Sequence, residues 1–398
     1  MKAVVFHDIG DIRLDHVPEP GLKESTDAIV RLTASAICGT DLHFVRGTFP
    51  GVEPGTILGH EGVGIVEEVG DEVRNFRPGD RVVIPSTIAC GCCSYCRSGY
   101  FAQCDNANPN GPDAGTSFFG GPSATGPFDG LQAEYARIPH AHVGLVRLPD
   151  EVDDDAAILI SDIFPTGYFG AELAEVTAGD TVVVFGCGPV GMFAIISAML
   201  MDAGRVIAVD CVPSRLEAAR RHGAETINFL EEDPVEVIKQ LTGGIGPDRA
   251  IDAVGIDAIH PDEGPASGGG AAFEEERSKV APDSAPEGDL WVPGSGPSQV
   301  LRWAVESLAK AGTLGIIGVY PPDFEVFPIG RAMNKNLTLR MGNCHHRRYL
   351  PELVRLVRSG AVDPTRVLSR HEPVVSAIEA YETFDQRRAG WLKVELEV

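Results

Sequence analysis

The chain has 398 residues, enough for two domains, and it is 43% hydrophobic and 23% charged, as globular proteins usually are. Its formal net charge of −24 excludes nucleic acid as a partner, because the phosphates would be repelled. The N-terminal residues lack the features of a signal peptide, and no apolar run reaches the ~18 residues that span a membrane. We therefore expect a cytoplasmic protein without membrane contacts, in which thiols stay reduced.

Two segments near the start carry residue types that bind metals. "CGTDLH", residues 38–43, supplies Cys38, and "GHEGVGIVEEVG", residues 59–70, supplies His60 followed by Glu61. A cysteine and a histidine so far apart are weak evidence alone, because a buried histidine is more often a hydrogen-bonded core residue. The neighbouring glycines and the acidic and hydroxyl side chains strengthen the case for a site.

Five cysteines crowd into "ACGCCSYCRSGYFAQC", residues 89–104. Four of them have a spacing that suits tetrahedral zinc, and four thiolates leave no open position for a substrate. Redox pairing or chance clustering is the alternative, but the spacing favours a structural zinc. Gly99 lets the chain turn back, and Cys92 is left as a spare thiol. The predicted ligands are Cys90, Cys93, Cys96 and Cys104.

The middle of the chain predicts a nucleotide-binding fold. "TVVVFGCGPVGMFAI", residues 181–195, reads as a buried strand, a GxGxxG turn and a helix. The next strand, "RVIAVD", ends in Asp210, where a carboxylate is expected to bind both ribose hydroxyls of NAD. Arg215 can pair with the extra phosphate of NADP, but Asp210 favours NAD. The glycines of the turn are Gly186, Gly188 and Gly191.

Further strand-like runs at 249–254, 313–320 and 336–341 alternate with helical stretches. This alternation predicts an α/β domain with a Rossmann-type, doubly wound parallel sheet. We find no internal repeats.

These motifs, in this order and together with the C-terminal "GWLKVELEV", closely resemble the zinc-dependent medium-chain alcohol dehydrogenases over nearly the whole chain. The resemblance implies a discontinuous catalytic domain, residues 1–163 and 342–398, with a β-rich chaperonin-10-like barrel. Residues 164–341 would form the NAD-binding domain between the two parts.

The resemblance also implies that Cys38 and His60 are two of three protein ligands to a catalytic zinc. The third position falls on Asp162, as in the glutathione-independent formaldehyde dehydrogenase branch. Cys38 and Asp162 would together balance the charge of Zn²⁺, and the open position would accept an alkoxide. Asp162 can alternatively cap a helix, because Ser161 and Asp162 precede a helical stretch.

Other roles follow from the same resemblance. Asp41 is the expected partner of His60. Thr40 would take the alcohol proton, and His43 would be the solvent-side end of the proton relay. Glu61 is either a transient zinc ligand or a structural carboxylate. Three further residues are expected at the cofactor, with Thr166 and Val319 near the nicotinamide and Lys393 near the pyrophosphate and Glu61.

Two segments depart from a minimal pattern. Residues 105–130 are rich in glycine and proline but carry Phe118, Phe119 and Phe128, which would either cover the substrate pocket or pack the loop. Residues 256–298 are acidic and low in complexity, which favours a mobile surface loop over a cover for the adenosine half of NAD.

The sequence thus predicts an enzyme with two zincs per chain that transfers a hydride from a small alcohol or a formaldehyde-like hydrated aldehyde to NAD. A polyol or amino-alcohol dehydrogenase, or a non-catalytic zinc or NAD(H) sensor, is the alternative. In the family that it resembles, the strand at 313–320 lies at a sheet edge and pairs with its twin. We therefore expect a homodimer or homotetramer.

Overall fold

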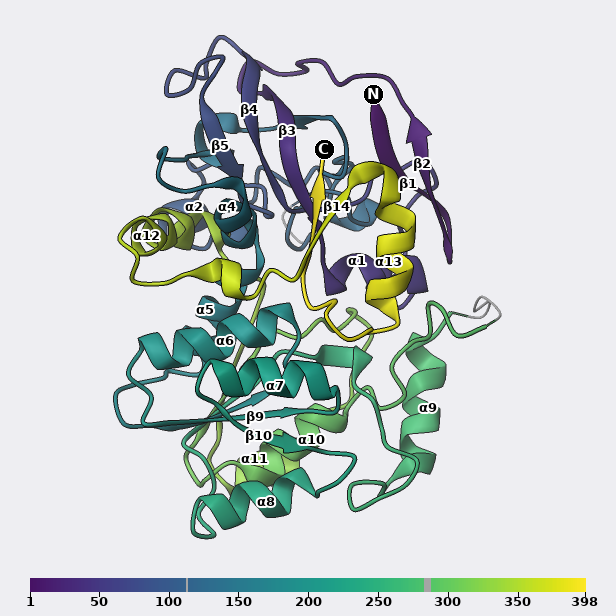
Figure 1. Ribbon diagram of the computed structural model, residues 1–398, viewed down its shortest axis with the longest axis vertical. Helices are drawn as coiled ribbons and strands as arrows, with labels where there is room; N and C mark the ends of the chain where they lie inside the picture. Colours follow the sequence, from purple (N-terminus) through teal and green to yellow (C-terminus); the bar gives the residue numbers. More distant parts are fainter. Residues whose placement is uncertain (112–113, 283–287) are drawn as a thin grey trace. The chain divides into compact units, whose positions relative to one another are not determined.

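The computed structural model describes residues 1–111, 114–282 and 288–398, and they form two compact units (Figure 1). The first unit comprises Met1–Pro165, Asn343–Val398 and a short piece that ends at Trp291. The second comprises Thr166–Asp283 and Val292–Gly342. Among the described residues, no helix has the length and apolar character that crossing a membrane requires.

The first unit is built on a seven-stranded sheet in the order β14-β15-β3-β4-β5-β7, with β6 also paired to β3. All pairs are antiparallel except β14 with β15, and β1 and β2 form a separate antiparallel pair. The strands are β1 (Lys2–Asp8), β2 (Asp11–His16), β3 (Ala28–Ile37), β4 (Gly62–Val69), β5 (Arg81–Ile84), β6 (Tyr135–Ile138), β7 (Val146–Arg147), β14 (Arg370–Pro373) and β15 (Val394–Glu397).

Short helices connect these strands, and α12 and α13 from the C-terminal part of the chain lie in the same unit (Figure 1). Capping residues determine where several of these helices begin or end. Asp153 caps α4 by accepting a hydrogen bond from Ala156 N at 2.9 Å, and Gly47 ends α1 with a φ of 73°. The α-helices are α1 (Gly39–Arg46), α2 (Ser94–Arg97), α3 (Ala141–Gly144), α4 (Asp154–Ser161), α12 (His346–Arg358) and α13 (Ala377–Asp385), and the 3₁₀ turns are η1 (Phe101–Gln103), η2 (Ser123–Thr125), η4 (Pro364–Arg366) and η5 (Val374–Ser376).

The second unit holds a six-stranded sheet in the order β10-β9-β8-β11-β12-β13, and every pair in it is parallel. This order and direction confirm the predicted Rossmann-type sheet. The strands are β8 (Thr181–Phe185), β9 (Arg205–Asp210), β10 (Glu225–Asn228), β11 (Arg249–Asp252), β12 (Thr313–Ile316) and β13 (Thr338–Met341).

Helices cover both faces of this parallel sheet. Apolar side chains of the central strands pack with α8 and α10 in one buried cluster. On the other face, α5 lies so close to α6 that a Cβ at Gly167 would meet backbone at 2.5 Å. The helices are α5 (Ile163–Leu173), which begins in the first unit, α6 (Pro189–Leu200), α7 (Pro213–Arg221), α8 (Pro234–Leu241), α9 (Gly270–Val280), α10 (Gln299–Ser307) and α11 (Ile329–Asn334), with the 3₁₀ turn η3 (Gly255–Asp257).

Two expectations from the sequence are wrong. The strand within 313–320 is β12, which lies between β11 and β13, so the sheet edge is β13 instead. The acidic segment 256–298 is not merely a loop, because it contains η3 and α9. Buried Glu276 anchors α9 by accepting hydrogen bonds from Arg302 and from the Ser298 backbone. The part of this segment at 283–287 lies outside the described residues.

Candidate active site and metal centres

Three elements of the first unit deliver the predicted catalytic ligands. Cys38 follows β3 and caps α1, His60 precedes β4, and Asp162 ends α4. The Ser161 hydroxyl accepts a hydrogen bond from Gly62 N at 3.0 Å and donates one to Ile84 O at 2.8 Å. These bonds tie the end of α4 to β4 and β5, and so hold Asp162 beside His60.

The ligand atoms of the three residues converge. His60 Nε2 lies 3.4 Å, and Cys38 Sγ 3.7 Å, from Asp162 Oδ2. Together with Glu61, their donor atoms all lie within 4.8 Å of one another, and all four residues are buried. Two ligands at about 2.1 Å from a tetrahedral zinc are about 3.4 Å apart. A thiolate, an imidazole and a carboxylate in this arrangement therefore fit zinc.

Glu61 has an unusual environment. One carboxylate oxygen accepts a hydrogen bond from Lys393 Nζ at 2.5 Å, and Lys393 also donates to Ile37 O at 3.0 Å. Both side chains are fully buried, and the other Glu61 oxygen has no hydrogen-bond partner. Burial raises the pKa of Glu61 to about 7, although Lys393 opposes the shift. An orphaned oxygen at this place matches a transient metal ligand.

Asp41 lies beside the other ring nitrogen of His60. Nδ1 lies 3.1 Å from Asp41 Oδ1, while Asp41 Oδ2 accepts a hydrogen bond from Cys38 N at 2.9 Å. Gln132 also donates to Asp41 Oδ2, at 3.4 Å, and accepts from Tyr381 OH at 2.9 Å. Burial lowers the pKa of His60, but the charges of Asp41 and Cys38 outweigh it and raise the pKa well above the usual value. Asp41 therefore lies where the partner of His60 was expected.

Two residues around Asp162 were not anticipated. His346 Nε2 donates to Asp162 Oδ1 at 2.7 Å, and Ser86 Oγ donates to the same oxygen at 3.0 Å. Thr87 Oγ1 lies 3.2 Å from the other ring nitrogen of His346. Burial opposes the charge of Asp162, but hydrogen bonds from His346 and His60 hold its pKa well below the usual value. The paired histidines in "NCHHRRYL" were the available sequence signal.

The predicted relay residues lie on α1. Thr40 Oγ1 is 3.8 Å from Cys38 Sγ, so its hydroxyl is next to the ligand set. His43 Nδ1 lies 3.0 Å from Thr48 Oγ1, and only 4% of His43 is exposed. His43 is therefore buried instead of facing solvent as expected, because the residues around it on α1 are buried too.

The aromatic residues of the 105–130 segment have different roles. Phe119 is buried in the apolar cluster that also contains three of the four cysteines predicted to bind the structural zinc. Phe128 packs against that cluster. Phe118 instead stacks on Phe44 at 5.9 Å and meets the ring of His60 edge-on at 6.4 Å. Two of the three thus pack the loop, and Phe118 forms an apolar wall beside the ligand set.

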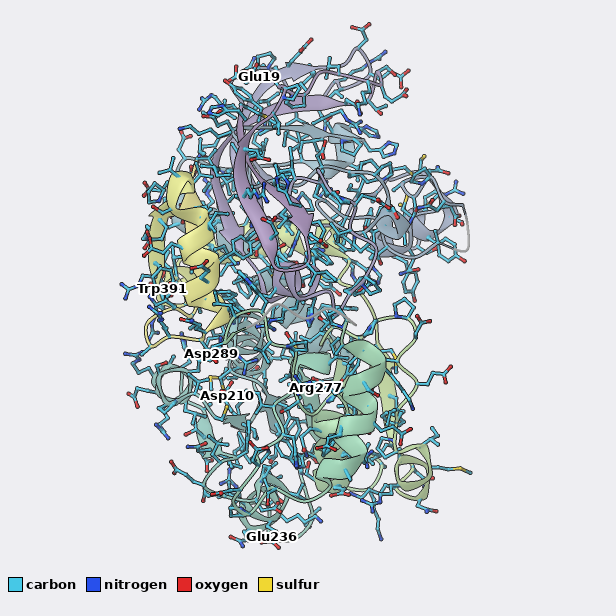
Figure 2. The ribbon with its side chains drawn as sticks, turned by 90° about the vertical axis from the view of Figure 1, so that its right-hand side faces the viewer. Glu19, Asp210, Glu236, Arg277, Asp289 and Trp391 are labelled. Atoms are coloured by element: carbon cyan, nitrogen blue, oxygen red, sulfur yellow. The ribbon has the colours of Figure 1, made fainter. Side chains whose placement is uncertain are left out.

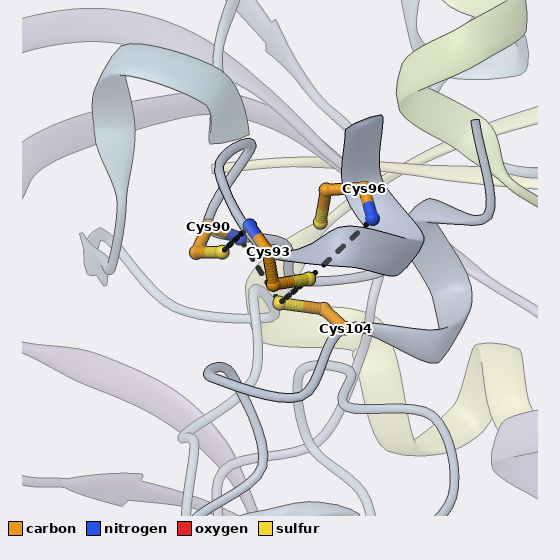
Figure 3. A group of neighbouring side chains, drawn as sticks. All are labelled: Cys90, Cys93, Cys96 and Cys104. Carbon is orange, nitrogen blue, oxygen red and sulfur yellow. Dashed lines mark hydrogen bonds between the residues drawn. The ribbon is translucent and has the colours of Figure 1, made fainter. Parts of the chain in front are cut away.

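The four predicted structural ligands converge in the same unit. Cys90, Cys93, Cys96 and Cys104 place their sulfurs within 4.8 Å of one another (Figure 3). The sulfurs of Cys90, Cys93 and Cys104 accept hydrogen bonds from backbone N–H groups at 3.2–3.4 Å. Burial opposes the charge of Cys90, but backbone N–H groups lower its pKa to about 6. Cys92 is exposed, and the set fits a closed zinc site.

The nucleotide turn of the second unit has the geometry that its glycines predict. Gly186 has a φ of 91°, and a Cβ at Gly191 would lie 1.9 Å from Gly186 O. Gly188 caps the N-terminus of the twelve-residue helix α6. The turn thus leaves backbone N–H groups and a helix N-terminus open to a pyrophosphate.

Asp210, labelled in Figure 2, ends β9 beside this turn. Its carboxylate accepts hydrogen bonds from Cys187 N at 2.7 Å, Cys211 N at 2.7 Å and Val212 N at 2.8 Å. Arg215 is also near, because a Cβ at Gly188 would lie 3.8 Å from its guanidinium. Asp210 is therefore fixed at the expected ribose position, and Arg215 remains within reach of the same turn.

The other predicted cofactor residues come from three different segments of the chain. Thr166 is in the first half of α5, and Val319 follows β12, where its carbonyl accepts a hydrogen bond from Ile256 N at 3.0 Å. Lys393 is in the first unit, in its buried contact with Glu61. Their contacts with a cofactor stay predictions.

Comparison with known proteins identifies the family of this chain. The alcohol dehydrogenase GroES-like domain matches residues 24–150, and the zinc-binding dehydrogenase domain matches residues 189–261. The zinc-type alcohol dehydrogenase-like protein AdhB of Bacillus subtilis is 38% identical over the full length of both chains. The chain belongs to the zinc-type alcohol dehydrogenase family.

Within this family, the alcohol dehydrogenase TADH of Thermus sp. ATN1 has a similar structure, with a TM-score of 0.81 and 34% identity over both full chains. The glutathione-independent formaldehyde dehydrogenase of Bacillus subtilis is 33% identical, over 86% of this chain and 80% of its own. Membership makes this chain a zinc-dependent alcohol dehydrogenase-like oxidoreductase that uses a nicotinamide cofactor.

Proposed function

We propose that this dehydrogenase oxidises a small alcohol or a formaldehyde-like hydrated aldehyde with NAD as the hydride acceptor. The observation that carries the proposal is the buried convergence of Cys38, His60 and Asp162 with the Thr40 hydroxyl beside them. A non-catalytic zinc protein would not require a hydroxyl next to the ligand set.

In this proposal, Cys38, His60 and Asp162 hold the zinc, and Glu61 offers its unpartnered oxygen. Zinc at such a site supplies Lewis-acid chemistry that lowers the pKa of an alcohol or hydrate hydroxyl. Cys38 and Asp162 contribute two negative charges, so Zn²⁺ with Cys38, His60 and Asp162 would be formally neutral. Asp41 and His346 orient the ligands, because each contacts a ligand side chain from outside the set.

The protein groups that handle the proton and the substrate lie on α1 and in the 105–130 segment. Thr40 would accept the substrate proton and pass it toward the cofactor ribose and His43, whose ring contacts Thr48. Phe44 and Phe118 would keep water away from this position through their stacked rings. A small apolar wall of this kind suits a small substrate.

Cofactor choice would follow from Asp210. Its carboxylate, which accepts a hydrogen bond from Cys187 N, would also accept hydrogen bonds from both ribose hydroxyls of NAD and would repel the 2′-phosphate of NADP. The glycine turn at residues 186–191 would bind the pyrophosphate of NAD and of NADP equally well.

The decisive test is a panel of alcohols and aldehydes with NAD or NADP, measured with and without added cofactor. Formation of NADH and of both acid and alcohol products should be followed. We expect NADH-forming turnover with small substrates, including formaldehyde. Preference for bulky polyols would overturn the substrate class, and absence of turnover with every member would overturn the catalytic assignment.

A further inference from the structure

A third group of ligand-type side chains lies in the first unit, at the opposite end of α4 from Asp162. Asp155 is in the first turn of α4, and His371 and Glu395 are cross-strand partners in the parallel pair β14–β15. One donor atom from each of these three residues lies within 4.8 Å of the others. None of the three belongs to either predicted zinc site.

The strand pattern explains how these side chains meet. In β15, Val394 and Leu396 are fully buried in an apolar cluster, so the alternating Glu395 points to the opposite face of the sheet. The N-terminal turn of α4 lies over that face, where Thr33 on β3 donates a hydrogen bond to Asp154 Oδ2 at 2.5 Å. The sheet and the helix therefore present carboxylates to one another.

Glu395 lacks the partner that a buried carboxylate needs. Only 3% of the residue is exposed, and its Oε2 has no hydrogen-bond partner. The nearest cationic candidate, His371 Nδ1, lies 3.8 Å from that oxygen, which is too long for a hydrogen bond. Arg81, which also lies beside the start of α4, is bound to Asp154. Burying an uncompensated carboxylate is costly, so the site calls for a cation.

We propose that Asp155, His371 and Glu395 form a third metal site, which binds a divalent first-row transition-metal cation such as Mn²⁺. His371 Nε2 lies 3.7 Å from Asp155 Oδ2 and Nδ1 lies 3.8 Å from Glu395 Oε2, and one donor atom from each residue lies within 4.8 Å of the others, so a modest movement of the side chains would let one ring nitrogen share an ion with both carboxylates. Two carboxylates balance a divalent charge, and an imidazole selects transition metals over Mg²⁺. His371 is 44% exposed, which leaves a path from solvent.

The charges around Glu395 also favour a bound cation. Burial, followed by the neighbouring carboxylates, raises the pKa of Glu395 to about 8, so a cation would replace a proton there. The titratable and charged groups that face Glu395 are Asp153, Asp154 with its partner Arg81, Asp155, His371 and Glu397.

The test is a titration with Mn²⁺ of the full-length protein that carries two zincs per chain, in which the electron paramagnetic resonance signal of free Mn²⁺ is measured. Mn²⁺ is the weakest binder of its series, so it leaves the zinc in the cysteine-containing sites. We expect one tightly bound Mn²⁺ per chain. His371→Ala and Glu395→Gln should each weaken binding at least about tenfold.

Glu372→Gln is the matched control, because it removes the same charge as Glu395→Gln from the residue next to His371, on the opposite face of β14. It should leave the affinity within about twofold, since it removes no ligand. If the wild type and the three variants all bind Mn²⁺ weakly and equally, the ion associates only with the acidic surface in general, and the proposal is overturned. If Glu395→Gln does not fold, the exposed His371→Ala decides the outcome alone.

Discussion

At the scale of single residues, the identity of the third catalytic ligand depends on its neighbours. An aspartate directly before a helix, as Asp162 is before α5, would ordinarily be an N-capping residue. Here Ser86 and His346 donate hydrogen bonds to one oxygen of Asp162, and the other oxygen faces Cys38 and His60. The carboxylate is thereby kept ionised and aimed at the predicted metal.

We predict that Asp162→Asn lowers the zinc content from about two to about one per chain, and lowers kcat/KM at least about 100-fold. An amide is a poorer zinc ligand and carries no charge. Metal analysis and steady-state kinetics measure the two effects. The exposed Asp150→Asn is the control and should behave like the wild type; retention of two zincs in Asp162→Asn would exclude Asp162 as a ligand.

The buried pair of Lys393 and Glu61 gives a second prediction. Lys393→Met should lower the free energy of unfolding by about 3 kcal/mol, because it leaves a buried carboxylate without its cation. Urea unfolding of the zinc-loaded protein measures the change. Adding Glu61→Gln to that variant should recover part of the loss, and a double variant less stable than Lys393→Met would contradict this explanation.

At the scale of elements, one loop concentrates a whole metal site. Gly99, with a φ of 89°, turns the chain after α2 so that Cys104 returns to the other three cysteines. Three of the four ligands are also part of the apolar cluster that contains Phe119. The predicted structural zinc would therefore stabilise both the loop and its packing against the sheet.

We predict that Cys96→Ser removes one zinc and lowers the melting temperature by at least about 5 °C, because metal binding contributes directly to folding here. Calorimetry and metal analysis give the readouts. Cys92→Ser is the matched control in the same loop, and it should keep both zincs, since Cys92 is exposed and outside the set. A larger effect from Cys92→Ser would mean that the ligands are wrongly assigned.

The turn between β8 and α6 and the end of β9 decide the cofactor. We predict that the wild type prefers NAD and that Asp210→Ser lowers the NAD-over-NADP ratio of kcat/KM at least about tenfold, because it removes the charge that repels the 2′-phosphate. Kinetics with both cofactors measure the ratio. Arg215→Ala should leave the preference for NAD intact. A wild type that prefers NADP would show that Arg215 governs the site.

At the scale of the whole molecule, the parallel sheet ends at β10 on one side and at β13 on the other. Strand β13 is an edge strand. Its Met341 is 61% exposed, and Ile329 on α11, the helix before β13, is 65% exposed. An exposed apolar edge tends to pair with another chain. The self-association expected from the sequence would thus use β13 and not β12.

We predict a dimer or tetramer by light scattering at micromolar concentration, and expect Met341→Lys to shift it toward the monomer by placing a charge in the paired edge. Ile245→Lys, at an apolar residue that is 75% exposed and not in the sheet, is the control and should not change the mass. A wild-type monomer would refute this prediction.

The sequence by itself determined the features that depend on local spacing. The cysteines at 90–104, the glycine turn at 186–191 and Asp210 could all be predicted, because their ligand geometry or backbone conformation is set within one loop or one strand–turn–helix unit. The strand–helix alternation likewise predicted the parallel sheet.

Only the tertiary structure decided what depends on residues far apart in the chain. His346 lies 184 positions after Asp162, and no spacing rule connects them. The sequence also predicted β12 as an edge strand, whereas the edge strand is β13, since strand order is set by the packing of whole strands and helices. Glu395 reads as an ordinary surface residue of a terminal strand. It becomes a buried, unpartnered carboxylate because α4 folds over that face of the sheet.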